Sequence, residues 1–311
     1  MKHIDIVIIN WNAGHLLAEA VNSIFQSNYE LTAISIIVID NASSDDSLHL
    51  LPLHPSLHVI QNKENIGFAS ACNQGFIYSK GDYFLLLNPD TRLFADTLLE
   101  SVRYMEHRKD ISILGVRHLD DEKEVHPSCS HFPKPIDFVV MSLGLHQIAP
   151  TVFRSPIVMT SYDYKKEGKV DQVMGAYMFM RRSDIEKYKL QMDERFFVYY
   201  EDLDFSKRLH DLGGISYYVP TISIVHKVNG TTDQIKGKRL FYSVISRLQY
   251  CKKHFGYGAY SVIVLFSLFI EPFTRILYLL ITRKVVEIKE ILKGYKMVYS
   301  CFFRLGCRKF F

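Results

Sequence analysis

Short apolar runs rich in β-branched residues alternate with segments of helical periodicity, and this alternation constrains the fold most. The first run covers residues 4–9, and apolar side chains then recur at helical spacing from Leu16 to Phe25. Similar runs follow at 34–39, 57–60 and 83–87. Unbroken apolar runs are typical of strands buried on both faces, and strands that alternate with helices form doubly wound sheets. We therefore expect an α/β fold with a mostly parallel sheet and flanking helices.

The composition is that of an ordinary globular protein, because 48% of the 311 residues are hydrophobic and 23% are charged. Such a chain buries a sizeable core and is not disordered as a whole. The formal net charge of +4 is too small to indicate nucleic-acid binding, and we expect no nucleic-acid partner. The cysteines include no CxxC pair, and the first apolar run is too short for a signal peptide. A reducing, cytosolic compartment is predicted.

The middle of the chain is less regular. Residues 117–165 carry five prolines and are predicted to be rich in loops. Strand character returns over 170–180, and helical periodicity runs from Glu201 to Leu212. After the second apolar run, the serines and aspartates at 43–46 are typical of the start of a helix.

The composition changes at about Arg239, where basic and aromatic residues begin to mix. Residues 259–270 are almost wholly apolar, but Glu271, Pro272 and Arg275 then interrupt the run. The uninterrupted part is shorter than the roughly 20 residues of a spanning helix. The pattern favours a helix that lies on an anionic membrane surface, and the alternative is a helix pair packed on the preceding domain. We expect one domain over 1–238 and a helical C-terminal region over 239–311.

The residues that follow the predicted strands indicate where a ligand binds. The loop after the first strand contains only Gly14, so the chain lacks the GxGxxG fingerprint, and it has no P-loop motif. Open α/β sheets still bind ligands beyond the carboxyl ends of their strands. Polar residues stand at three of these ends: Asn10-Trp11, Asp40-Asn41 and Asn88-Pro89-Asp90. The sequence therefore predicts a polar ligand site at this edge of the sheet.

Seven short motifs follow one another between residues 3 and 255. They are INWN at 9–12, VIDNAS at 38–43, NIGFA at 65–69, NQG at 73–75, LNPD at 87–90, VMGA at 173–176 and YEDLD at 200–204. In this order and spacing they resemble glycosyltransferase family 2, and in particular its rhamnosyltransferase-like branch, which builds bacterial cell-surface polysaccharides. The resemblance implies a GT-A fold over 1–238, with a donor half of about 1–115 and an acceptor half of about 116–238.

The resemblance assigns several residues to the donor pocket. Asp40 is expected to accept the imide N–H of uracil or thymine, although an aspartate there also suits a helix cap. Trp11 is expected to stack on the base, with a core tryptophan as the alternative. Asn10, Asn65 and Gly67 complete the predicted pocket, and Gly67 also suits a turn.

The resemblance also implies a divalent cation, Mg²⁺ or Mn²⁺, at the donor diphosphate. Asn88-Pro89-Asp90 stands where related enzymes carry Asp-x-Asp, so Asp90 is the expected ligand and Asn88 departs from the pattern. A plain turn is the alternative reading. His226 is expected to complete the metal site, although it is one of 13 histidines. The loop at 230–232 is expected to lie on the donor side.

Catalysis is expected at the motif that opens the helix at Glu201. Direct displacement needs a base for the acceptor hydroxyl, and the resemblance places it in this motif, where we choose Asp202. Glu201 is expected to orient that base or to bind acceptor hydroxyls, while the helix dipole alone also favours acids there. Gly175 and Ala176 would let the acceptor sugar approach the backbone, or would simply pack tightly. The arginines at 181–182 could meet a lipid diphosphate, and the alternative for at least one of them is a solvated face.

The function predicted from these residues is inverting transfer of a sugar, in the first place L-rhamnose from dTDP-rhamnose. The expected acceptor is a saccharide linked to polyprenyl diphosphate, at the cytoplasmic face of a bacterial cell membrane. The enzyme would be peripheral there, held by its C-terminal region. Two alternatives remain open: the same chemistry with a UDP- or GDP-sugar, and a non-catalytic module that binds a nucleotide or a lipid.

Overall fold

The computed structural model describes residues 2–28, 32–148, 153, 157–227 and 236–303. The chain divides into two compact units. Unit 1 contains Met1–Ser130, Tyr162–Asp193 and Asp202–Thr231. Unit 2 contains His131–Ser161, Glu194–Glu201 and Thr232–Phe311. The second unit thus combines the C-terminal region with two segments from the middle of the chain.

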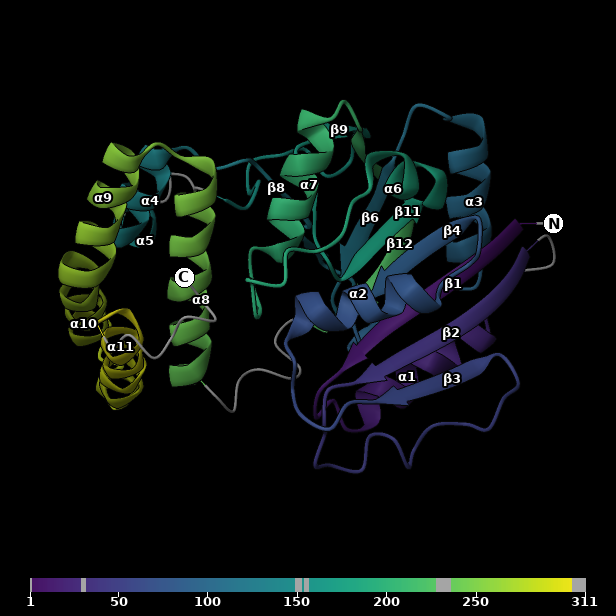
Figure 1. Ribbon diagram of the computed structural model, residues 1–311, viewed down its shortest axis with the longest axis horizontal. Helices are drawn as coiled ribbons and strands as arrows, with labels where there is room; N and C mark the ends of the chain where they lie inside the picture. Colours follow the sequence, from purple (N-terminus) through teal and green to yellow (C-terminus); the bar gives the residue numbers. More distant parts are fainter. Residues whose placement is uncertain (1, 29–31, 149–152, 154–156, 228–235, 304–311) are drawn as a thin grey trace. The chain divides into compact units, whose positions relative to one another are not determined.

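Unit 1 is built on a mixed sheet (Figure 1). Four of the seven neighbouring pairs along its main path of strands are parallel. Its strands follow the order β3-β2-β1-β4-β11-β6-β12-β5. Their bounds are β1 Lys2–Asn10, β2 Thr32–Asp40, β3 Leu57–Gln61, β4 Tyr83–Leu87, β5 Thr91–Leu93, β6 Ile113–Leu119, β11 Tyr177–Arg181 and β12 Ser216–His226. Short strands β7 (Val125–His126) and β9 (Gly168–Val170) pair with β6 and β12, while β8 (Cys129–Ser130) and β10 (Gln172–Val173) pair with each other. The predicted α/β fold with a mostly parallel sheet is confirmed.

Helices cover both faces of this sheet (Figure 1). α1 (His15–Phe25) and α3 (Thr97–His107) bury their apolar sides in one core with the even-numbered residues of β1. α2 (Phe68–Tyr78) lies on the other face, where a Cβ on Gly75 would come within 2.4 Å of Val7 Cγ1. α7 (Glu201–Asp211) lies beside α2, because Phe205 stacks on Phe76. α6 (Arg182–Tyr188) follows β11 directly.

Two local predictions are wrong. No helix starts at 43–46, where the chain is irregular and bends before a turn at 47–50. The side chains there bond to the β1 loop instead: Asp45 Oδ2 accepts the Gly14 N–H at 2.8 Å, and Ser43 Oγ accepts the Asn12 N–H at 2.9 Å. Such side chains compete with helix formation when they find other partners. The strand expected over 170–180 is broken between β10 and β11, because the Gly175 N–H donates to Asp202.

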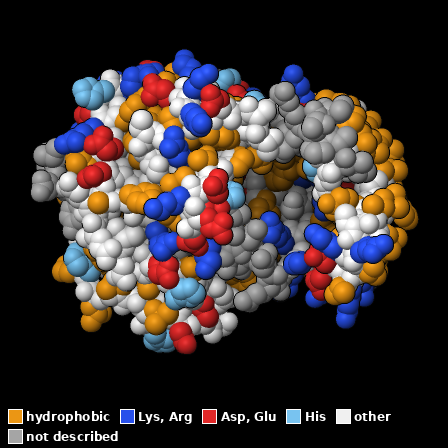
Figure 2. Space-filling view, turned by 180° about the vertical axis from the view of Figure 1, so that it is seen from behind, with side chains coloured by type: hydrophobic (Ala, Val, Ile, Leu, Met, Phe, Trp, Pro, Cys, Tyr) orange, Lys and Arg blue, Asp and Glu red, His pale blue; other side chains and the backbone are white. Residues whose placement is uncertain are grey.

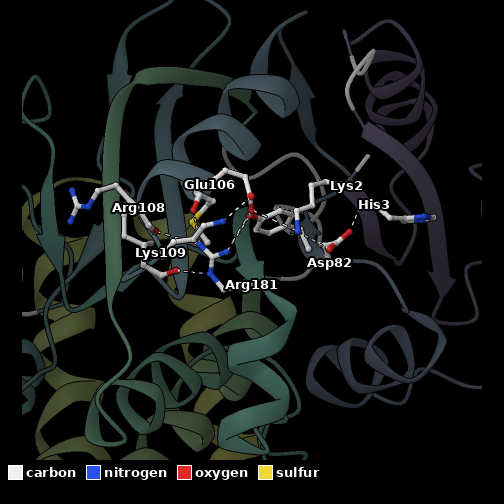
Figure 3. Close-up of polar contacts among 10 residues, drawn as sticks. Lys2, His3, Asp82, Glu106, Arg108, Lys109 and Arg181 are labelled. Carbon is white, nitrogen blue, oxygen red and sulfur yellow. Dashed lines mark hydrogen bonds and ion pairs between the residues drawn. The ribbon is translucent and has the colours of Figure 1, made fainter.

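A polar network ties the sheet together at the amino ends of β1 and β4 (Figure 3). Arg181 donates to the Met105 carbonyl at 2.7 Å and to Tyr83 Oη at 3.2 Å, so it also satisfies the end of α3. Lys2 donates to Asp82 Oδ1 at 2.9 Å. These bonds stabilise the amino ends of β1 and β4, at the opposite end of the strands from the polar residues that follow their carboxyl ends.

Unit 2 is helical. Its helices are α4 Pro135–Ser142, α5 Leu145–Ile148, α8 Lys236–His254, α9 Tyr257–Leu265, the π-helical turn η2 Phe266–Ile270, α10 Glu271–Ile281, the 3-10 turn η3 Val285–Glu287 and α11 Ile288–Phe303. α9, η2 and α10 form one continuous helix of 25 residues with a mean hydropathy of 1.8 in its most apolar window. The uninterrupted apolar run is short, as the sequence indicates, but the helix as a whole is long and apolar enough to cross a membrane by length and composition alone. The π-helical turn ends two residues before Pro272, which has no backbone N–H to donate to a helical hydrogen bond.

Candidate active site

The carboxyl ends of β1 and β2 lie in register and bring Asn10 beside Asp40. Asn10 Nδ2 donates to Asp40 Oδ1 at 2.7 Å, and Asp40 Oδ2 accepts the Ser43 N–H at 3.1 Å. Both side chains are buried, and Asn10 Oδ1 has no hydrogen-bond partner among the described residues. Each carboxylate oxygen of Asp40 keeps a second lone pair, so the group can accept a further donor. The alternative role for Asp40, a helix cap, is not fulfilled: its bond to the Ser43 N–H closes a turn, and no helix follows.

The loops after these two strands have unusual backbone conformations. Asn12 and Ala42 have φ angles of 52° and 57°, in the left-handed region, which asparagine tolerates but alanine rarely adopts. Trp11 lies between the strand end and Asn12, is partly exposed, and is not one of the buried core residues. The alternative of a core tryptophan is therefore not supported. Strained backbone of this kind clusters at functional sites.

Asn65 and Gly67 lie next to the same edge. Asn65 Oδ1 accepts the Gly67 N–H at 2.9 Å, and the Gly67 carbonyl accepts from Asn41 Nδ2 at 3.2 Å. Gly67 has φ 90° and ψ 164°, a conformation that is essentially restricted to glycine. The sharp turn therefore explains the glycine, and it places Asn65 beside the residue that follows Asp40.

The Asn88-Pro89-Asp90 segment is a turn held from two sides. The Asn88 N–H donates to the Ala176 carbonyl at 3.1 Å, and the Asp90 carbonyl accepts the Lys227 N–H at 3.0 Å. These bonds bring Asp90 to the end of β12, where its Oδ1 lies 3.4 Å from His226 Nε2. Both side chains are buried, and Asp90 Oδ1 has no hydrogen-bond partner among the described residues.

This pair fits a divalent cation. Two ligands that share an octahedral ion at about 2.1 Å lie roughly 3 Å apart, close to the observed separation. In the part of the chain that the structure describes, no group of three His, Cys, Asp or Glu side chains could hold a metal. The protein would therefore supply two ligands, and Mg²⁺ commonly takes its remaining ligands from phosphate oxygens and water.

His118 is a neighbour of this site that the sequence did not reveal. It lies on β6, which pairs with β12, and its ring meets the His226 ring edge-on with centroids 5.4 Å apart. Burial lowers the pKa of His118 well below its usual value, and the neighbouring His226 acts in the same direction. No sequence motif marks it, because only the pairing of β6 with β12 makes the two histidines neighbours.

Asp202, the candidate base, is held by three donors. Its Oδ2 accepts from Gln172 Nε2 at 2.9 Å and from the Gly175 N–H at 3.1 Å, and its Oδ1 accepts the Leu203 N–H at 2.8 Å. Burial raises the pKa of the Asp202 carboxyl, and these hydrogen bonds oppose part of that effect. A Cβ on Gly175 would lie 3.3 Å from Asp202 Oδ2, so the small residue admits the carboxylate itself.

Glu201 is buried at the first position of α7 and belongs to unit 2. The two residues before it, Tyr199 and Tyr200, have φ angles of 71° and 69°. The backbone that leads into the candidate catalytic motif is thus strained as well.

Arg181 and Arg182 do not reach this site, and the expectation that they meet a lipid diphosphate is wrong. β11 runs antiparallel to β4 and pairs Arg181 with Tyr83, so the arginines lie at the amino end of β4, whereas Asp90 follows its carboxyl end. A cavity of about 810 Å³ opens there, and its arginines already bond to protein groups. The predicted donor-side loop at 230–232 lies outside the described residues.

The fold and the site define the class of protein. The architecture is that of GT-A-like glycosyltransferases. A mannosyltransferase from Pyrobaculum calidifontis, solved with GDP-Man and Mn²⁺, matches 96% of this chain and 86% of its own at a TM-score of 0.55 and 13% identity. GalNAc-T7, solved with UDP, GalNAc and Mn²⁺, matches 81% of this chain and 48% of its own at a TM-score of 0.59 and 12% identity. At these identities the likeness concerns the fold.

The chain belongs to glycosyl transferase family 2, whose model matches residues 5–189. The rhamnosyltransferase WbbL of Escherichia coli is 27% identical over 54% of this chain and 61% of the relative. N-acetylglucosaminyl-diphospho-decaprenol L-rhamnosyltransferase of Mycobacterium tuberculosis is 26% identical over 62% of this chain and 66% of the relative. The chain thus spans just under two thirds of the length of these relatives. The resemblance to the rhamnosyltransferase-like branch is confirmed.

Proposed function

We propose that this chain is an inverting glycosyltransferase with its donor site at the carboxyl ends of β1, β2 and β4 and its base at Asp202. One observation supports this most. The candidate metal turn and the candidate base meet at one dipeptide, because Asn88 donates to the Ala176 carbonyl at 3.1 Å and Gly175 donates to Asp202 at 3.1 Å. Direct displacement requires a base close to the metal-bound diphosphate, and the shared dipeptide Gly175-Ala176 would hold the two groups near each other.

The donor nucleotide would lie across Trp11, Asp40 and the turn at Asn65 and Gly67. The second lone pairs on Asp40 and the unpartnered Asn10 Oδ1 would accept the imide N–H of a pyrimidine. Asp90 and His226 would hold the divalent cation, Mg²⁺ or Mn²⁺, beside Asn88. When bound, the cation offsets the charge that develops on the leaving diphosphate.

The reaction would be a single displacement. The bond between the acceptor oxygen and the anomeric carbon forms while the bond from that carbon to the diphosphate oxygen breaks, which inverts the centre. Asp202 takes the acceptor proton, and the nucleoside diphosphate leaves. Gly175 and Ala176 would line the acceptor side, and Glu201 would bind acceptor hydroxyls or orient the base.

The proposed donor is dTDP-rhamnose, and the proposed acceptor is a saccharide on polyprenyl diphosphate. The names of the two relatives support this, since both are rhamnosyltransferases and one name specifies a diphospho-decaprenol acceptor. UDP- and GDP-sugars are the alternative donors, because Asp40 suits uracil as well as thymine. We place the enzyme at the cytoplasmic face of a bacterial membrane as a peripheral protein, which is where such an acceptor is accessible to a cytosolic donor.

A non-catalytic nucleotide- or lipid-binding module is the second candidate, and the observation that favours it is Asn88, which replaces an acid of the expected metal motif. The retained Asp90, His226 and Asp202 favour the enzyme.

The test is a transfer assay with the purified chain, Mn²⁺ and a short polyprenyl-diphosphate-linked N-acetylglucosamine. dTDP-rhamnose, UDP-sugars and GDP-sugars are compared, and mass spectrometry detects the product. Metal-dependent transfer that Asp202→Asn abolishes supports the proposal, and a preferred UDP- or GDP-sugar changes only the donor. Binding of nucleotide without transfer from any donor would favour the non-catalytic module.

A further inference from the structure

The continuous helix Tyr257–Ile281 in unit 2 exposes an apolar stripe along its length. The exposed side chains recur every three or four residues: Val262 47%, Leu265 52%, Phe269 49%, Phe273 70%, Leu277 56% and Leu280 51%. Figure 2 shows such hydrophobic side chains gathered over the helices of unit 2, with Lys and Arg side chains beside them. Contiguous exposed apolar surface of this kind marks a binding surface.

The opposite side of the same helix is buried and carries a charged residue, Glu271, between the apolar Leu268 and Leu279. Glu271 is 1% exposed and accepts from Arg275 Nε at 2.8 Å, from Ser142 Oγ at 3.3 Å and from Arg247, which is also buried. A helix on a water-soluble domain turns a polar face to the solvent, whereas the outer face of this helix is apolar along its length. Ionisable residues of lipid-exposed helices instead turn inward and pair with one another. The partner of the outer face is therefore lipid rather than water.

The neighbours of this helix argue against a spanning orientation. It packs against α4, α8 and α11, and no described helix other than Tyr257–Ile281 is long and apolar enough to cross a membrane. α11 exposes three lysines at helical spacing, Lys289, Lys293 and Lys296. A transmembrane orientation of the packed helices would carry these ammonium groups into the hydrocarbon, where they are strongly disfavoured. In an orientation along the surface they remain at the headgroups.

We propose that the helix Tyr257–Ile281 lies in the plane of a bilayer rich in anionic lipids, with its exposed stripe among the acyl chains. Arg283, Lys284 and the lysines of α11 would contact the anionic headgroups. The Glu271 cluster would fix the rotation of the helix so that the stripe faces outward. This inference deepens the proposed function, since it assigns the surface by which the enzyme would reach a membrane-bound acceptor.

The first test is sedimentation of the full chain with vesicles of phosphatidylglycerol and phosphatidylcholine, without any sugar substrate. The wild type is expected to bind, and more strongly than to pure phosphatidylcholine. The double variant Phe269→Asp/Phe273→Asp should bind at least about tenfold less, because it places charge on the embedded face. Ile77→Asp is the matched control: Ile77 is as exposed as Phe273 but lies on α2 of unit 1, and this variant should bind like the wild type.

The second test measures depth. A fluorophore is attached to a single new cysteine at Val262, Phe269 or Leu277 in a Cys307→Ser background, and lipids with quenchers at two acyl depths are compared. An in-plane helix gives the same shallow depth at all three positions. A depth that is greatest at Phe269 would overturn the proposal in favour of a spanning helix, and absence of wild-type binding would overturn it outright.

These tests separate the inference from the proposed function. Asp202→Asn should bind vesicles like the wild type, whether or not the chain transfers sugar. Vesicle binding without transfer in solution assays would leave the membrane surface intact and contradict only the enzymatic proposal.

Discussion

Asp90 Oδ1 lies 3.4 Å from His226 Nε2, although the two residues are far apart in the chain, one in the turn after β4 and the other at the end of β12. The carboxylate oxygen is buried and has no hydrogen-bond partner among the described residues. A buried acceptor without a partner is costly, so an arrangement that keeps one next to an imidazole nitrogen is best explained by a ligand between them.

Asp90→Asn is expected to weaken Mn²⁺ binding by at least about tenfold. The substitution replaces the carboxylate, which is the only anionic one of the two candidate ligands, with a neutral amide. Asn88→Asp should have the opposite effect and tighten Mn²⁺ binding, because it adds a carboxylate at the same turn. Electron paramagnetic resonance of free Mn²⁺ in the presence of dTDP measures both. Equal affinities in the three proteins would contradict the assignment of the metal site.

His118 should act through His226 rather than on the metal itself. His118→Ala removes the ring that packs edge-on against His226 and is expected to weaken Mn²⁺ binding by about tenfold, the size typical for groups that orient a ligand. His118→Phe keeps a ring in the same place and should restore most of the affinity. If both variants lose Mn²⁺ binding equally, the packing of the His118 ring against His226 does not explain the effect.

Asp202→Asn should lower kcat by at least about a hundredfold, because the amide cannot take the acceptor proton. The affinity for the nucleotide should stay within about twofold, since Asp202 bonds to Gln172 and Gly175 and not to the donor edge. Turnover numbers and isothermal titration with dTDP provide the two readouts. Substantial residual turnover would exclude Asp202 as the base.

The pH profile should report the environment of Asp202. Burial raises the pKa of this carboxyl above its usual value, and the base must be deprotonated, so activity should fall on acidification at a pH above that expected for an ordinary aspartate. Gln172 donates to the charged form and lowers the pKa. Gln172→Leu should therefore move the acid limb of kcat/KM to higher pH, and a move to lower pH would refute the argument.

Gly67→Ala should destabilise the fold by about 1–3 kcal/mol, because φ 90° with ψ 164° is nearly restricted to glycine. It should also weaken nucleotide binding, since the turn supports Asn65. Gly258→Ala is the matched control: it lies in α9, no atom lies within 4 Å of its added Cβ, and alanine favours helices. Urea unfolding of both variants measures the difference, and similar losses would argue against strain at Gly67.

The sheet and the donor edge could be predicted from local patterns. The apolar runs that became β1, β2 and β4 are buried on both faces, and parallel strands bring their carboxyl ends to one edge whatever the rest of the fold does. The neighbourhood of Asp40 with Asn10, and the position of Asp90 on the same edge, followed from this geometry. The remaining candidate site residues were predicted from the family motifs.

Other features depended on contacts between distant segments. The serines and aspartates after Asp40 have the composition of a helix start, yet they bond to the β1 loop, which local sequence does not reveal. Arg181 and Arg182, at the end of β11, could have met a phosphate, but β11 runs antiparallel to β4 and carries them to the opposite end of the sheet. The direction of a strand inserted from far along the chain is decided by its pairing, not by its composition.

The sequence by itself determined the fold class, the family and the edge of the sheet where chemistry is expected, because periodicity and short motifs are local properties. Only the tertiary structure decided which groups meet: Asp90 with His226, His226 with His118, and Asp202 with Gly175. It also decided that the apolar helix of unit 2 turns Glu271 inward and its phenylalanines outward. The buried Glu271 carboxylate is stable only when it is paired with cations, and one of them, Arg247, lies on another helix. The rotation of the apolar helix is therefore decided only when the helices pack.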